Sequence, residues 1–306
     1  MIPFRVTLVD VGPRDGLQNE KQTVDSAVKI ELVHRLQAAG LRDIEVTSFV
    51  SPKWVPQMAD NTAVLAGIER KPGVRYSVLI PNMKGLDAAL SMPRAQWPDE
   101  IVVFAAATEA FSQKNINCSI AESIERFRPV VAGAHGHGIK VRGAVSVALG
   151  CPYQGEVSAD EVERVVQLIK EIGVDHCGVC DTIGVGTPKR VQAAMERALR
   201  HYPLAEVSGH FHDTYGQAIG NVYASLEVGI AAFDASVAGL GGCPYAKGAT
   251  GNVASEDVLY MLDGLGIETG VDMGKLMAAG DFICGVLGRP TLSRVARALS
   301  AKTKAA

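Results

Sequence analysis

A regular alternation of short apolar, β-rich runs with amphipathic stretches is the feature that most constrains this chain. The apolar runs lie near residues 6–11, 43–48, 75–80, 101–107, 141–148, 176–181, 207–212 and 233–238. The amphipathic stretches between them include 26–39, 119–134, 159–172 and 188–201. Strands that alternate with helices are joined by crossovers and therefore run parallel. Eight such units predict an α/β fold that closes into a (β/α)8 TIM barrel.

The chain length fits the same fold. The 306 residues suit one barrel of roughly 250 residues with an extension. Helical patterns continue after the eighth unit, near 255–264, 272–286 and 291–301. We expect a single domain over 1–306, with the barrel over about 5–265 and a C-terminal helical extension over about 266–301. An open doubly wound sheet is the competing fold, but no glycine fingerprint for a dinucleotide follows the first run.

The net charge and the hydropathy pattern limit the kinds of molecule that this chain is expected to bind. The net charge of −3 gives no electrostatic reason to expect nucleic acid. No apolar run approaches the ~20 residues that span a bilayer, and no signal or transit peptide precedes the first run. We therefore expect a cytoplasmic protein that binds neither nucleic acid nor a membrane.

We expect the cysteines to be free thiols and not to form a disulfide framework. They are scattered at positions 118, 151, 177, 180, 243 and 284. Cys177 and Cys180 have a spacing found in redox and zinc sites, but residues three apart in a strand face opposite sides. A metal or a disulfide at this pair is therefore disfavoured.

Polar residues collect where the strands of a barrel would end. Active sites of TIM barrels lie at the carboxyl ends of the strands, so these residues are expected to share one rim. They are Arg14, Asp15, Gln18, Glu45, Ser48, Asp181, His210, His212, Cys243 and Asn252.

Two His-x-His motifs have the same spacing but different expected positions. His210 and His212 face one side of the seventh strand, where Asp15 and Asn252 can add oxygen ligands. Two imidazoles and two oxygens without a thiolate suit Mg²⁺ or Mn²⁺ better than zinc, although a purely structural histidine pair is the alternative. His135 and His137 fall before the fifth strand, on the opposite rim, and are predicted to be helix-end or loop residues.

Several rim residues allow both a catalytic and a structural interpretation. Arg14 suits the stabilisation of a developing enolate oxygen, or it forms a simple ion pair with Asp15. Glu45 orients Arg14 or satisfies another neighbour, and Asp181 has the same ambiguity. Cys243, in a glycine-rich loop, is a reactive residue on a lid or an inert thiol in a turn.

Long blocks of the sequence, including GPRDGLQNEK, SFVSPKWVPQMAD, HDTYGQA and VAGLGGCPYAKGATGN, resemble the 3-hydroxy-3-methylglutaryl-CoA lyase family. The resemblance covers about residues 6–290. It implies a metal-dependent TIM-barrel lyase that cleaves this acyl-CoA to acetyl-CoA and acetoacetate by a retro-Claisen reaction, as in leucine degradation. We also expect a homo-oligomer, a dimer.

The resemblance carries the family's functional residues onto matching positions. It implies metal ligation by Asp15, His210, His212 and Asn252. It implies catalytic roles for Arg14, Asp15, Glu45, Asp181, His210 and Cys243. It implies substrate or CoA contacts by Arg14, Gln18, Ser48, Lys114 and Asn115. The last two precede an expected helix N-terminus, which favours a phosphate group.

The chain departs from the family pattern near the expected active rim. Ala144 replaces a tyrosine, Gly178 replaces a serine, and Cys180 replaces a glycine. These changes allow a bulkier or related 3-hydroxyacyl-CoA substrate, of the 3-hydroxy-3-alkylglutaryl-CoA or citramalyl-CoA type. A related Claisen or aldol enzyme and a non-catalytic metal- or CoA-binding barrel are the competing functions.

Overall fold

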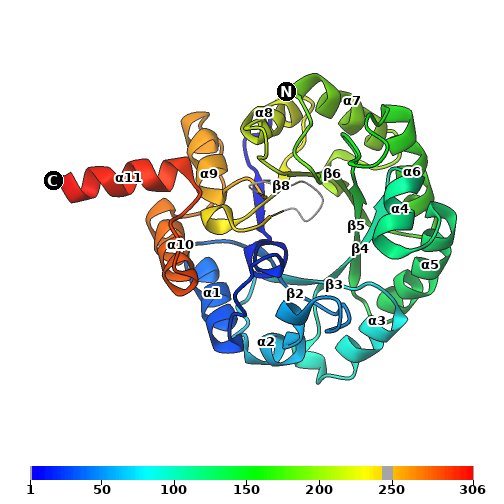
Figure 1. The fold of residues 1–306 in the computed structure, drawn as a ribbon, viewed down its shortest axis with the longest axis horizontal. Coiled ribbons are helices and arrows are strands. Elements are labelled where there is room, and N and C mark those ends of the chain that lie inside the picture. The colour runs from blue at the N-terminus through cyan, green and yellow to red at the C-terminus, as the bar shows by residue number, and fades with distance from the viewer. Residues whose placement is uncertain (1, 243–250, 306) are drawn as a thin grey trace.

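The computed structural model describes residues 2–242 and 251–305, and within these residues eight strands form one closed parallel barrel (Figure 1). Each strand pairs with the next along the chain, and β8 pairs with β1. The strands are β1 (Thr7–Asp10), β2 (Asp43–Ser48), β3 (Arg75–Leu79), β4 (Glu100–Ala106), β5 (Lys140–Ser146), β6 (His176–Asp181), β7 (Val207–Phe211) and β8 (Ala232–Ala235). Every predicted run overlaps one of these strands, so the predicted TIM barrel is confirmed.

Helices surround the barrel on its outer side (Figure 1). They are α1 (Ser26–Ala38), α2 (Asn61–Gly67), α3 (Met83–Leu90), α4 (Glu109–Ile116), α5 (Ile120–Gly136), α6 (Ala159–Glu171), α7 (Pro188–Ala198) and α8 (Ala218–Glu227). The four amphipathic stretches named from the sequence correspond to α1, α5, α6 and α7. A capping box of Ser119 and Glu122 begins α5, since each side chain bonds the other's backbone N–H.

Among the residues that the structure describes, three α-helices follow β8: α9 (Ser255–Gly264), α10 (Met273–Leu287) and α11 (Arg294–Ala305). They coincide with the helical patterns predicted near 255–264, 272–286 and 291–301, and α11 projects away from the barrel (Figure 1). Asp257 of α9 anchors the start of α11 by accepting hydrogen bonds from Ser293 Oγ (2.5 Å) and the Val295 backbone N–H (2.9 Å). None of the helices in the described part of the chain is long and apolar enough to cross a membrane.

Alternation along β7 shows how the barrel presents polar side chains to its interior. A Cβ on Gly209 would meet Phe211 and Met195 of α7, so this face of the strand packs against the helices. His210 and His212 point the other way and line a cavity inside the barrel. The period of two therefore places both imidazoles inside the barrel, as predicted.

The turn after β1 is a short π-helix, η1 (Gly12–Gly16), which the sequence did not indicate. Small residues are required here, because a Cβ on Gly16 would lie 2.7 Å from Leu240 Cβ. The buried carboxylate of Asp10 holds the turn by accepting hydrogen bonds from the backbone N–H groups of Gly12 and Val237, both at 2.9 Å. The turn thereby carries Arg14 and Asp15 over the end of the barrel.

Candidate functional site

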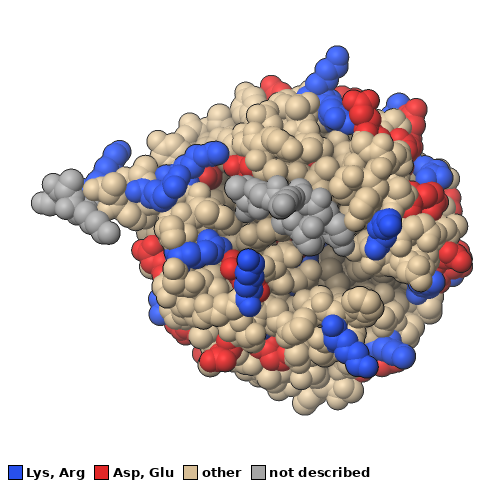
Figure 2. Space-filling view, in the orientation of Figure 1, with Lys and Arg blue, Asp and Glu red and all other residues tan. Residues whose placement is uncertain are grey.

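A cavity of about 1090 Å³ opens at the end of the barrel where the strands finish. The face seen in Figure 2 is hollowed, and Lys and Arg side chains stand at several points around the hollow. Side chains from η1 and from the interior faces of β2, β5, β6, β7 and β8 form its inner part. Among the predicted site residues, those that line the cavity are Arg14, Asp15, Gln18, Glu45, Lys114, Asn115, His210 and His212.

A carboxylate and two imidazoles come together at the inner end of this cavity. The possible ligand atoms of Asp15, His210 and His212 all lie within 4.8 Å of one another, and His212 Nε2 is 4.0 Å from Asp15 Oδ2. Asn252 lies beside them, because its amide nitrogen donates a 2.7 Å hydrogen bond to Asp15 Oδ2. The four residues predicted to share a metal site are therefore neighbours in space.

The protonation states of these groups suit a divalent cation. Burial raises the pKa of Asp15, but Arg14 and the two histidines outweigh burial and hold it well below its usual range. Burial and the nearby His210 lower the pKa of His212 to about 4. At neutral pH the site thus offers an ionised carboxylate and a neutral imidazole, the forms that bind metals.

Arg14 is fixed between two carboxylates. Its Nε donates to Glu45 Oε1 and its Nη1 donates to Asp15 Oδ1, each at 2.6 Å. Burial lowers the pKa of Arg14, but the charges of Glu45 and Asp15 outweigh burial and raise it. The guanidinium is therefore a fixed positive charge at the cavity wall, next to the Asp15 carboxylate.

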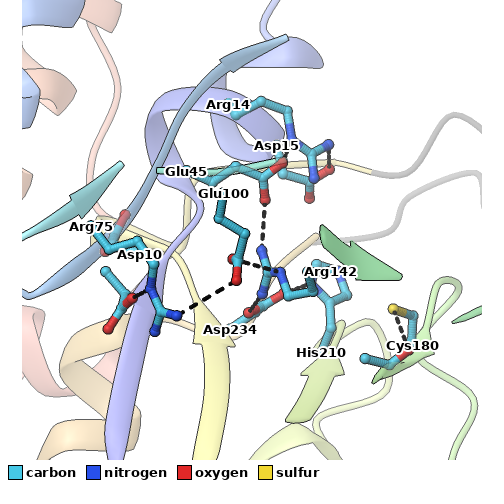
Figure 3. Close-up of polar contacts among 12 residues, drawn as sticks. Asp10, Arg14, Asp15, Glu45, Arg75, Glu100, Arg142, Cys180, His210 and Asp234 are labelled. Atoms are coloured by element: carbon cyan, nitrogen blue, oxygen red, sulfur yellow. Dashed lines mark hydrogen bonds and ion pairs between the residues drawn. The ribbon is translucent and has the colours of Figure 1, made fainter. Parts of the chain in front are cut away.

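Two residues that sequence reasoning missed extend this network, Arg142 on β5 and Asp234 on β8 (Figure 3). Arg142 donates to Glu45 Oε2 (3.2 Å) and to Asp234 Oδ1 (2.6 Å). The other oxygen of Asp234 lies 3.1 Å from His210 Nδ1. The sequence did carry a signal for both residues, because each is a charged residue inside an apolar run that predicts a buried strand. Charged side chains are seldom buried unless they are paired.

Asp181 and Ser48 lie at the ends of their strands but do not belong to the residues that line the cavity. The Asp181 carboxylate accepts the backbone N–H groups of Val185 (3.1 Å) and Gly186 (2.8 Å), and burial raises its pKa to about 6. Ser48 Oγ accepts the Val50 N–H at 3.1 Å. Both side chains thus shape the loops after their strands, whereas Cys180, one residue before Asp181, faces the cavity.

Lys114 and Asn115 line the cavity from an element that was not foreseen. They lie in the last turn of α4, a helix that was not predicted, and they precede the N-terminus of α5, as expected. Asn117 ends α4 in a left-handed conformation, and Ser119 then begins α5. The Lys114 charge is therefore presented from a helix C-terminus, which favours a cation there.

Cys243 lies outside the described residues. The residues on either side of the 243–250 segment meet at the rim, because a Cβ on Gly251 would fall 2.5 Å from the Gly241 carbonyl carbon. Gly242 lines the cavity, and its carbonyl accepts a 3.1 Å hydrogen bond from the Asn19 side chain. The chain therefore enters and leaves this segment beside Asn252.

The second His-x-His motif lies where the sequence predicted, at the end of α5. His137 is the C-terminal cap residue of α5, and its Nδ1 lies 2.9 Å from the Gly133 carbonyl. His135 Nε2 lies 2.9 Å from the Asp175 carboxylate, just before β6. Both contacts are structural. Cys177 and Cys180 are separate free thiols, as expected.

Ala144 and Gly178 both line the cavity and are directly paired across β5 and β6. A Cβ on Gly178 would meet its nearest neighbour, Ser208 Oγ, at 3.5 Å, which is an ordinary contact distance. A larger side chain therefore has room to begin at this position. These two small residues therefore form one continuous patch of the cavity wall.

Comparison with known proteins places these features in a family. The HMGL-like family model matches residues 5–283. The chain is 58% identical to a 3-hydroxy-3-isohexenylglutaryl-CoA/hydroxy-methylglutaryl-CoA lyase of Pseudomonas aeruginosa, over 98% of this chain and 99% of the relative.

Solved structures give the same result. A hydroxymethylglutaryl-CoA lyase from Pseudomonas aeruginosa superimposes with a TM-score of 0.95 at 58% identity, over 98% of this chain and 99% of the other. An HMG-CoA lyase from Acinetobacter baumannii, in complex with coenzyme A and 3-methylmalate, gives a TM-score of 0.90 at 34% identity, over 96% and 95% of the two chains. The fold and the cavity are those of a TIM-barrel enzyme. The chain belongs to the HMGL-like family.

Proposed function

We propose that this chain is a metal-dependent carbon–carbon lyase that cleaves 3-hydroxy-3-methylglutaryl-CoA to acetyl-CoA and acetoacetate. The observation that carries the proposal is the placement of Arg14 beside the Asp15, His210 and His212 cluster in one cavity. The 58% identical relative from Pseudomonas aeruginosa, named for this activity, supports it.

The donor set fits Mg²⁺ or Mn²⁺, held by Asp15, His210, His212 and Asn252, since it combines oxygen and imidazole donors without a thiolate. Asn252 would present its amide oxygen once the amide group is reversed, because its nitrogen now faces Asp15. When bound, the cation supplies Lewis-acid polarisation of the substrate's tertiary hydroxyl and carboxylate.

Arg14 stabilises the charge that forms during cleavage. The tertiary hydroxyl gives its proton to a base. We assign this role to a water beside His210, because Asp234 holds Nδ1 of that imidazole and its Nε2 would ligate the cation. The electron pair of the O–H bond then forms the second carbon–oxygen bond of the ketone. The electrons of the broken carbon–carbon bond pass to the acetyl carbon and its thioester oxygen, where the fixed Arg14 guanidinium faces the negative charge. A proton returned to that carbon completes acetyl-CoA, and we propose Cys243 as its donor.

The outer part of the cavity suits the CoA portion of the substrate. Gln18, Lys114 and Asn115 line it, and Lys114 offers a positive charge for a phosphate group. The Acinetobacter baumannii structure, which holds coenzyme A, supports the same class of substrate. We therefore propose acyl-CoA thioesters, and not free hydroxy acids, as substrates.

The test is mass spectrometry of the products formed from a panel of 3-hydroxyacyl-CoA thioesters. We expect acetyl-CoA and acetoacetate in equal amounts from 3-hydroxy-3-methylglutaryl-CoA. A chain that binds the thioester with no release of acetyl-CoA would be a binding barrel, and the proposal would fail. Condensation of acetyl-CoA with a keto acid, in place of cleavage, would instead identify a synthase.

A second candidate substrate carries a longer alkyl or alkenyl branch at the tertiary carbon. The paired Ala144 and Gly178 leave space in the cavity wall, and the Pseudomonas aeruginosa relative is also named for an isohexenyl substrate. Each methylene of a branch buried there would contribute about 0.8 kcal/mol, or roughly a fourfold change in affinity.

We expect the double substitution Ala144→Tyr, Gly178→Ser to shift selectivity toward the methyl-branched substrate. The tyrosine ring fills the space that a longer branch would occupy, so kcat/KM for a branch of several carbons should fall by about 10-fold or more relative to methyl. The measurement is kcat/KM for both substrates. Gly136→Ser, at the other end of the barrel where nothing contacts the new Cβ, is the control. An unchanged ratio in the double variant would exclude the enlarged pocket.

A further inference from the structure

The two oxygens of Asp234 have different partners. Oδ1 accepts a 2.6 Å hydrogen bond from Arg142 Nη1, and Oδ2 lies 3.1 Å from His210 Nδ1. Asp234 is buried on β8, directly across from His210 in the strand register. The Arg142 guanidinium, at 2.6 Å, pairs with this buried carboxyl and keeps it ionised, since a buried charge is retained when an opposite charge pairs with it.

An ionised carboxylate accepts hydrogen bonds and donates none. The short approach of Asp234 to His210 therefore requires the imidazole proton to lie on Nδ1. A neutral imidazole with a proton on Nδ1 has its lone pair on Nε2, the nitrogen left for other contacts. The hydrogen bond also limits rotation of the ring, since both residues project from paired strands.

We propose that Asp234 is a positioning residue that holds the His210 imidazole in its Nδ1–H form and so presents Nε2 to the divalent cation. This inference rests on the metal-dependent function proposed above. Carboxylates behind ligating histidines fix the tautomer and orientation of the ring, and their loss lowers metal affinity or activity by about 10–100-fold.

The contact with Arg142 explains why position 234 needs the carboxylate of aspartate and why the amide of asparagine is not sufficient. Arg142 already bridges to Glu45 Oε2 at 3.2 Å, and Glu45 Oε1 holds Arg14 Nε at 2.6 Å. Asp234 must therefore satisfy a fixed Arg142 and a fixed His210 at once, through two acceptor oxygens. An asparagine at 234 has one acceptor oxygen and must give up one of the two partners.

The first measurement is the tautomer of His210 in the full-length wild-type chain. Imidazole ¹⁵N shifts are recorded on ¹⁵N-histidine-labelled protein, at a pH above the His210 pKa and with and without Mg²⁺. A His210→Gln variant identifies the signals. We expect a protonated Nδ1 in both states. A proton on Nε2 in the wild-type chain would overturn the inference, whatever any variant does.

The second measurement compares Mn²⁺ dissociation constants of the wild-type, Asp234→Asn and Asp43→Asn chains. Asp43 is the matched control, because it is a similarly buried strand carboxylate whose partner is Arg75 and which does not belong to the cavity wall. We expect about 10–100-fold weaker binding for Asp234→Asn, a mixed tautomer of its His210, and no change for Asp43→Asn. Wild-type affinity in Asp234→Asn would overturn the inference. A wild-type chain that binds no Mn²⁺ would overturn the metal-dependent function instead, and the tautomer would then decide alone.

Discussion

Replacing Arg14 by glutamine is expected to lower kcat by at least about 10²–10³-fold, the cost of removing one preorganised donor from a developing oxyanion. The loss is expected to be larger than for a neutral donor, because the guanidinium carries a full positive charge that Glu45 and Asp15 hold in place. The measurement is the rate of acetyl-CoA formation at saturating substrate. Because the interaction is strongest in the transition state, kcat should fall far more than KM changes.

The control for this prediction is Arg70→Gln. Arg70 pairs with Asp99 at 2.6 Å and stacks on Tyr76, and it lies away from the cavity wall. Its loss removes an arginine ion pair without touching the proposed chemistry, so kcat should stay near the wild-type value. Thermal unfolding of both variants separates lost catalysis from lost structure. A folded Arg14→Gln chain with a near-normal rate would remove Arg14 from the mechanism.

The barrel could be predicted from the sequence because parallel strands that are covered by helices are buried on both faces. Each strand then appears as a short apolar run, and the eight runs were found with small errors at their ends. The helices were harder to predict. α2, α3 and α4 contain only 7, 8 and 8 residues, too few for a clear helical period. The position of Lys114 and Asn115 within α4 was missed for this reason.

The cluster of Asp15, His210 and His212 could be predicted because its geometry follows from local rules. Residues two apart in a strand share a face, and the ends of barrel strands share a rim. The network behind the cluster depends on contacts across the barrel. Arg142 meets Glu45 and Asp234, which are 97 and 92 residues away in the chain. The sequence shows that each charge is buried in a strand, but it does not show which opposite charge neutralises it.

The same period of two explains why Asp181 does not line the cavity. Cys180 faces the cavity, so the next residue in the strand must face away from it. The Asp181 carboxylate accordingly bonds the backbone of the following loop, at Val185 and Gly186. A polar residue at the end of a barrel strand therefore lines the cavity only when it has the same parity as the cavity-facing residues of that strand.

Replacing His212 by alanine is expected to weaken Mn²⁺ binding by at least about 100-fold, since removal of a ligand should cost no less than removal of a partner behind one. The imidazole is buried and neutral, so it coordinates without losing a proton at neutral pH. We expect a chelated wild-type chain to be inactive and to recover with Mg²⁺ or Mn²⁺, whereas the His212→Ala chain should recover only at much higher metal concentration. Titration of Mn²⁺ gives the affinity directly, and acetyl-CoA release gives the recovery.

His137→Ala is the matched control, because His137 belongs to a motif of the same spacing at the opposite end of the barrel. Its ring packs against Trp97 at 5.2 Å and bonds the Gly133 carbonyl, so its loss should affect the stability of α5 and leave Mn²⁺ affinity unchanged. Equal loss of affinity in both variants would contradict the assignment of the metal site to the His210 and His212 motif. We expect the loss of affinity in His212→Ala alone, because His212, unlike His137, lies beside Asp15 and Asn252.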